Sequence, residues 1–112
     1  MIEKNLMAAI LDSLKGPILF ADTDHIVRYM NTAAVAHYEG GATLLGRSVL
    51  DCHKSESQRE MIEILAAMEA GETERLIVDD EKERIFMRVV RDSSGRVLGY
   101  YKRYEPPTQK AR

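Results

Sequence analysis

The sequence predicts an α+β domain with one antiparallel sheet, because strand-like and helix-like segments alternate along the chain in a fixed order. Two short apolar segments flank an acidic turn near residue 23, which indicates a β-hairpin. Segments with helical spacing fill the middle of the chain, and three strand-like segments separated by short polar turns follow Gly71. Because short turns join strands in antiparallel order, these observations predict a five-stranded antiparallel sheet with helices on one face and an N-terminal amphipathic helix.

Length and composition fit one globular unit. The 112 residues are 45% hydrophobic and 30% charged, enough to bury roughly two thirds of the unfolded surface. Sixteen basic against 18 acidic residues give a net charge of -2, which leaves no positive field for a nucleic-acid backbone. No apolar stretch approaches the ~18 residues of a membrane helix, and a single cysteine forms no internal disulfide. We therefore expect a cytoplasmic protein that binds neither nucleic acid nor membrane.

Residues 2–15 have the spacing of an amphipathic helix that ends before Gly16 and Pro17. Its apolar residues form one stripe at four-residue steps and a second stripe beside it: Ile2, Leu6, Ile10 and Leu14, with Met7 and Leu11. This surface is wider than one mixed sheet face can bury. We therefore expect these six residues to form a homodimer interface, because a two-fold contact is the commonest closed assembly.

The early hairpin is expected to run from Pro17–Ala21 through the turn Asp22–His25 into Ile26–Met30. Asn31 follows directly, and its side chain can accept the first free amides of a short helix that begins at Thr32. Gly40 and Gly41 end that helix, and the connector that follows has no clear strand or helix period.

A long helix is expected to open with a capping box at Ser55 and Gln58, or at Ser57 and Glu60, and to end at Gly71. One face of this helix is apolar: Met61, Ile62, Leu65 and Met68. The three strands that follow are predicted at residues 73–79, 83–91 and 96–104. In the middle one, alternation places apolar side chains on one face and mixed side chains on the other, and the first helix is the expected cover for the mixed face.

Three motifs resemble those of PAS domains, which are small sensor modules, and the resemblance covers residues 5–104. Asp22–Ala34 is similar to the family's acidic turn followed by an aliphatic, aromatic, Asn and Ala-Ala run, with His25 where Gly is usual. The position calls for left-handed backbone, which His tolerates. Leu44–Asp51 resembles the family's aliphatic-Gly-Arg connector, and Asp92–Gly95 followed by Gly99 resembles its last hairpin.

The resemblance implies an N-terminal dimerisation helix at residues 1–15, a PAS core at 16–105 and a flexible tail at 106–112. It also implies a non-enzymatic sensory or regulatory domain that binds a small ligand or a signalling partner and signals through dimerisation. The alternatives are a haem-binding sensor that uses His53 and a ligand-free protein–protein interaction module. An enzyme is least favoured because Arg84 and Arg88 are the only strand charges considered for an inward position, and both suit the exposed face.

The candidate pocket lies beneath the long helix, between the early hairpin, the short helix and the late strands. Its residues are Phe20, Tyr29, Val35, Tyr38, His53, Met87 and Val89. The simpler interpretation is that these side chains fill the core, and the sequence favours it.

His53 falls where PAS domains border their internal cavity, so it could ligate haem iron or hydrogen-bond a ligand. A polar residue in a solvated loop is the favoured interpretation. Cys52 is displaced from the reactive cysteine of flavin-binding members, and the flavin-contacting residues are missing, so we expect an ordinary thiol and no flavin. No second Cys or His lies close enough in the sequence to complete a metal site, so we expect no bound metal.

Overall fold

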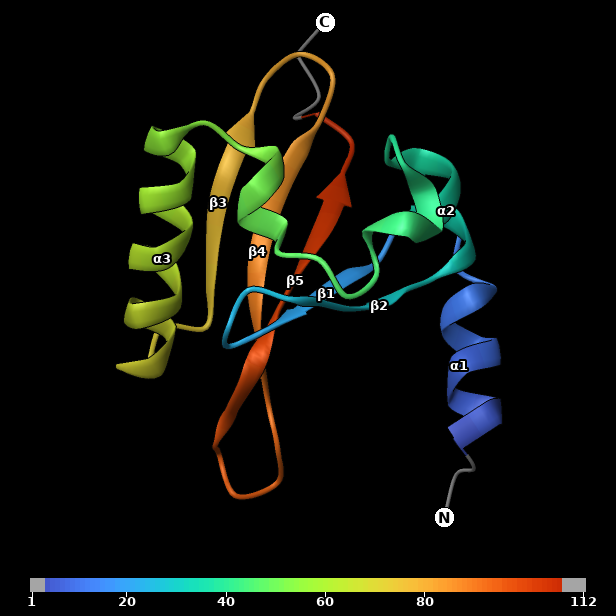
Figure 1. The fold of residues 1–112 in the computed structure, drawn as a ribbon, viewed down its shortest axis with the longest axis horizontal. Helices are drawn as coiled ribbons and strands as arrows, with labels where there is room; N and C mark the ends of the chain where they lie inside the picture. Colours follow the sequence, from blue (N-terminus) through green and yellow to red (C-terminus); the bar gives the residue numbers. More distant parts are fainter. Residues whose placement is uncertain (1–3, 108–112) are drawn as a thin grey trace, which may run out of the picture.

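Five strands form one antiparallel sheet in the computed structural model, which describes residues 4–107 (Figure 1). The strand order is β2-β1-β5-β4-β3, so the last strand of the sequence lies at the centre of the sheet. The helices are α1 (Lys4–Asp12), α2 (Thr32–His37) and α3 (Ser55–Glu69), with 3-10 helices η1 (Gly41–Leu44) and η2 (Val49–Cys52). The strands are β1 (Leu19–Asp22), β2 (Val27–Met30), β3 (Glu74–Asp79), β4 (Arg84–Arg91) and β5 (Val97–Glu105). The predicted fold class is confirmed.

One face of the sheet, here called the inner face, is covered by α2, α3 and the 3-10 helices (Figure 1). It carries Leu19, Ala21, Met87 and Tyr100, none more than 3% exposed. The side chains that α3 buries are Met61, Ile64, Leu65 and Met68. The sequence pattern placed Ile62 on this face, but Ile62 is 48% exposed and Ile64 takes its place. With 3.6 residues per turn, position 64 lies closer than position 62 to the line through Met61 and Met68.

The outer face of the sheet is the opposite one, and it carries Phe20, Tyr29, Phe86 and Tyr101. Phe86 lies between two guanidinium groups, those of Arg84 and Arg103, whose central carbons are 5.1 and 4.1 Å from the ring centroid. Glu74 pairs with Arg103, and this hydrogen bond lowers the pKa of the Glu74 carboxyl. Glu105 bonds both arginines. On the part of the predicted mixed face around Phe86, ion pairs between strands therefore surround the aromatic ring.

Helix α1 covers only one corner of this outer face. Leu11 and Leu14 border an apolar hollow of about 440 Å³ together with Ile18, Phe20, Tyr29, Val90 and Tyr101. The remaining apolar residues of the helix, Leu6, Met7 and Ile10, stay about half exposed, and Ile2 lies outside the described residues. The helix also ends at Asp12 instead of residue 15, because the Ser13 hydroxyl donates to the Ile10 carbonyl and the chain turns there.

Asn31 joins four elements through one buried side chain. Its Oδ1 accepts from the Ala34 amide, which caps α2 as the sequence predicted, and from the Ile18 amide before β1, both at 2.9 Å. Its Nδ2 donates to the carbonyls of Leu11 and Gly16 at 2.9 and 3.1 Å. All four hydrogen-bonding positions of the amide are therefore used at a residue with no exposed surface.

The N-terminus of α3 differs from the predicted capping box. Lys54 occupies the cap position and makes no side-chain cap bond. Gln58 instead donates from its Nε2 to the carbonyls of Leu50 and His53, at 2.8 and 2.9 Å. Gln58, which the sequence places in the capping box, therefore connects α3 to η2 and the residue after it. The start of a helix has free N–H groups and no free carbonyls, so the acceptors for the Gln58 amide come from Leu50 and His53.

Gly99 lies where β5 passes closest to β1. A Cβ atom at this position would stand 2.0 Å from the Ala21 carbonyl oxygen and 2.8 Å from the Phe20 ring, and the backbone φ is 153°. The contact with the carbonyl involves backbone at the sheet centre, so no side-chain rotation relieves it.

We predict that Gly99→Ala lowers the free energy of unfolding by roughly 2 to 3 kcal/mol, because the methyl group forces β1 and β5 apart. Chemical denaturation measured by circular dichroism tests this. Gly16→Ala is the control, since Gly16 has open space around it and no unusual φ, and it should unfold like the parent protein. Equal stability of the two variants would contradict the close approach.

Candidate functional site

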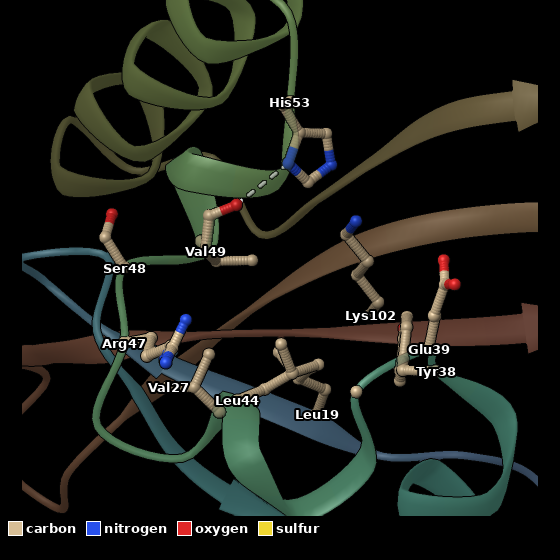
Figure 2. Close-up of a pocket in the computed structure, with 11 residues that line it drawn as sticks. Leu19, Val27, Tyr38, Glu39, Leu44, Arg47, Ser48, Val49, His53 and Lys102 are labelled. Carbon is tan, nitrogen blue, oxygen red and sulfur yellow. Dashed lines mark hydrogen bonds between the residues drawn. The ribbon is translucent and has the colours of Figure 1, made fainter.

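A cavity of about 360 Å³ lies between the inner face of β1 and β5 and the chain from α2 to His53 (Figure 2). Three of its walls are core side chains, Leu19, Val27 and Val49, each no more than 7% exposed. Tyr38 and Leu44 extend this apolar surface and are partly buried. Exposed residues Glu39, Gly40 and Arg47 form the mouth, and Ser48, His53 and Lys102 complete the lining. The cavity is thus apolar inside and charged at a few defined points.

Lys102 brings a positive charge to the inner face. It sits on the central strand β5, directly opposite Leu19 on β1 and Met87 on β4. Figure 2 shows its side chain rising from the strand into the cavity on the side of His53. A lysine at such a position covers apolar neighbours with its stem and presents its ammonium group to the cavity.

His53 borders the cavity with a defined tautomer. Its Nδ1 lies 2.8 Å from the Val49 carbonyl oxygen, and since a carbonyl only accepts, Nδ1 carries the proton in this bond. The neutral ring therefore has its lone pair on Nε2, which is free of this backbone bond (Figure 2). His53 can accept a hydrogen bond from a ligand at Nε2, and it lies partly buried in the segment between η2 and α3.

Tyr38 links the cavity wall to the C-terminal half of β5. Its hydroxyl is hydrogen-bonded to that of Tyr104, and burial raises the pKa of both phenols. The His37 ring packs against both tyrosine rings with centroids 4.8 and 5.1 Å away. Both phenols therefore stay protonated at neutral pH, so each keeps a hydroxyl donor.

The residues proposed from the sequence fall into three places. Tyr38 and His53 line the cavity. Met87 is fully buried beneath it, Val89 packs against the core, and Val35 is 37% exposed on α2. Phe20 and Tyr29 lie on the outer face, in the hollow beside α1, so the sheet separates them from Tyr38 and His53.

Of the residues that line the cavity, the sequence predicts only Tyr38 and His53, and the charged residue on its strand wall, Lys102, is among those it does not predict. The two strand arginines named in the sequence analysis, Arg84 and Arg88, do lie on the outer face. The signal was present in the alternation of the last strand: once Tyr100 points inward, Lys102 and Tyr104 must share its face. Arg47 was noted only as part of the connector motif.

The β1–β2 turn holds the back of the cavity. His25 takes the left-handed conformation predicted for it, with φ at 65°, and its carbonyl accepts from the Val49 amide at 2.7 Å. Its Nδ1 shares a 2.8 Å hydrogen bond with the Tyr100 hydroxyl, and only 8% of the residue is exposed. Asp22 braces the same turn by accepting from the amides of Asp24 and Ile26.

A haem group does not fit this cavity. His53 has the tautomer that iron ligation requires, with Nδ1–H on a backbone carbonyl. However, 360 Å³ lies near the lower end of the roughly 300 to 1,000 Å³ typical of ligand pockets, and a tetrapyrrole is a large flat ligand. Across residues 4–107 no three His, Asp, Glu or Cys side chains gather as a metal site. The side chain of Cys52 lies outside the described part.

The comparisons with known proteins agree on the fold. The family model described as PAS domain matches residues 7–103. Similar solved structures include a C-terminal domain from Streptococcus mutans, with TM-score 0.77 and 18% identity over 94% of this chain and 85% of that one. The PAS domain of Bordetella pertussis BvgS is similar with a TM-score of 0.65 and 19% identity, and the match covers 95% of this chain and 87% of that one. The Vibrio cholerae Aer2 receptor, described as a dual PAS-heme oxygen sensor, has a TM-score of 0.61 and 18% identity, and the match covers 83% of this chain and 95% of that one.

No curated protein matches the chain. In the described range, no helix has the length and apolar character needed to cross a bilayer.

We predict that His25 makes stability depend on pH. Burial lowers its pKa below the ordinary value of 6.5, so below that pH the unfolded chain binds the proton more readily. The stability contribution is present above pH ~6.5 and is lost as the pH falls through the lower pKa of the folded state. One proton corresponds to a slope of at most about 1.4 kcal/mol per pH unit.

Urea unfolding between pH 7.5 and pH 5 tests this prediction. His25→Asn, which also tolerates the left-handed backbone, should show a shallower loss of stability than the parent protein. Identical slopes for His25→Asn and the parent would show that another group is responsible.

Proposed function

Because the chain belongs to the PAS domain family, we propose that it is a non-enzymatic sensory domain that takes a small ligand into the cavity beneath α2, η1 and η2. The observation that carries this proposal is the cavity itself, which combines an apolar interior with Lys102 and His53. Ligand pockets are built this way, since apolar walls supply affinity and a few polar groups fix the orientation.

The position of β5 supports a route from the cavity to the rest of the domain. Lys102 and Tyr104 face the cavity side of this strand, while Tyr101 and Arg103 occupy its outer side. A ligand that shifts β5 would therefore also shift Tyr101, which borders the hollow beside α1. One strand therefore contributes side chains to both the cavity and the hollow, which makes it the contiguous element through which the two regions could be coupled.

We further propose that the protein forms a homodimer through α1. In this proposal the homodimer passes the signal on, either directly or through a second signalling protein. Four apolar side chains of the N-terminal segment are between 43% and 51% exposed: Leu6, Met7, Ile10 and Leu14. Leu11, also proposed for the interface, is partly buried against the hollow. Burying these side chains against a second copy yields ~25 cal/mol per Å². We place the protein in the cytoplasm, consistent with its single cysteine.

We predict that the cavity accepts small organic molecules. In a fragment screen followed by two-dimensional NMR, the amide resonances of Leu44, Val49 and His53 should shift with millimolar or tighter dissociation constants. Leu44→Trp should fill the space and weaken this binding at least about tenfold, a loss of about 1.4 kcal/mol. Leu45→Trp, at an exposed neighbour, is the control. Fragments that never shift these resonances would favour the ligand-free interaction module.

We predict a dimer at tens of micromolar in light scattering coupled to size exclusion. Leu6→Glu with Ile10→Glu should give a folded monomer, because two charges per helix would otherwise be buried without partners. Asn5→Glu with Ala9→Glu adds the same charge at exposed positions beside the apolar stripe and should leave more dimer. A monomeric parent protein, or a double variant that still dimerises fully, would rule out α1 as the interface.

A further inference from the structure

We propose that the ligand is a small monocarboxylate with an apolar body, held by Lys102 inside the cavity and drawn in past Arg47 at the mouth. This inference rests on the proposed function, because it names the class of molecule for the same cavity. It is carried by the position of Lys102 on the inner face, by the balance of charge around the cavity, and by the cavity's size.

Lys102 is a charged residue of the lining and lies on the inner face of the central strand. Its cross-strand neighbours, Leu19 and Met87, are 3% and 0% exposed, so the base of its side chain stands in the core. A carboxylate offers the ammonium group a charge-assisted hydrogen bond, which is stronger than the hydrogen bond that a neutral ligand offers. An ammonium group has three donors, so it can serve a ligand alongside its contacts within the protein.

The other charges of the cavity favour an anion of single charge. Arg47 is exposed at the mouth, where its positive charge attracts anions before they enter. Glu39 is also exposed at the mouth and opposes a second negative charge on the ligand. Lys102 and Arg47 are cationic and Glu39 is anionic, so these three lining residues favour an anion over a cation.

His53 and the apolar walls define the rest of the molecule. Because Nδ1–H is bonded to Val49, Nε2 accepts, so it suits a hydroxyl or N–H group on the ligand body and not the carboxylate. Leu19, Val27 and Val49 surround the remaining space with hydrocarbon. At ~30 Å³ for each water-sized volume, 360 Å³ holds on the order of ten non-hydrogen atoms. A carboxylic acid of about six carbons, with or without a hydroxyl group, has this size.

The test compares three probes of equal length by NMR titration: hexanoate, hexanamide and hexylamine. The parent protein should bind hexanoate at least about tenfold more tightly than hexanamide, or about 1.4 kcal/mol, and hexylamine most weakly. This comparison needs no variant and so does not depend on any substitution folding. Lys102→Met keeps the hydrocarbon stem and should reduce the preference for hexanoate to less than about threefold. Lys82→Met, in the exposed β3–β4 turn, should retain it.

The outcomes separate this inference from the proposed function. If hexanamide binds as tightly as hexanoate and Leu44→Trp weakens both, the cavity is a ligand site and the carboxylate assignment is wrong. If the preference for hexanoate survives Lys102→Met in a protein with a dispersed spectrum, Lys102 is not the anchor and the inference is overturned. If the fragment screen yields cavity ligands but hexanoate does not bind, the inference fails while the proposed function stands. If no fragment enters the cavity, both fail.

Discussion

The buried amide of Asn31 is the interaction on which the arrangement of both sides of the sheet depends. It ends β2, caps α2, receives the amide that precedes β1 and holds two carbonyls at the end of α1 and the start of the following loop. Only a carboxamide offers two acceptor and two donor positions in this geometry, because a carboxylate lacks the donors and an aliphatic side chain lacks both. The start of α2 leads to Tyr38 and the cavity, and the end of α1 leads to the apolar hollow. One side chain therefore fixes both the start of α2, which leads to the cavity, and the segment that follows α1, which leads to the hollow.

The central strand β5 then connects these two regions by strand geometry alone. Successive side chains alternate between faces, so Tyr100, Lys102 and Tyr104 face inward while Tyr101 and Arg103 face outward. Gly99 lets the strand approach β1 closely enough for both sets to pack. β5 also has hydrogen-bonded neighbours on both sides, β1 and β4. The proposed route from the cavity to the hollow beside α1 runs through this strand.

Local chemistry made much of this fold predictable, while the site depended on facts that are not local. The turn at Asp22, the cap at Asn31 and the order of the strands and main helices along the chain follow from short-range preferences, and the left-handed His25 follows from the family resemblance; the structure confirms them. Phe20 and Tyr29 were expected beside Tyr38 because the early hairpin and the short helix were expected to border one cavity beneath the long helix. Which face a strand residue occupies depends on register, however, and a shift of one residue reverses it. Lys102 was missed because charge suggests exposure, although a lysine stem packs well against apolar side chains.

The two faces of the sheet deal with charge in different ways, and this difference locates the site. On the outer face the arginines of β4 and β5 bond carboxylates within the sheet, so that Glu74 and Glu105 serve Arg84, Arg88 and Arg103. Each such pair is partly exposed and contributes about 0 to 1 kcal/mol, and together they form a surface whose charges are matched by the protein itself. On the inner face Lys102 lines the cavity together with Glu39 and Arg47. Under the proposed function, a ligand in this cavity contacts β5 from its inner side, and the sheet separates it from the ion pairs of the outer face. The response to a ligand is therefore expected to begin at β5 on its inner side.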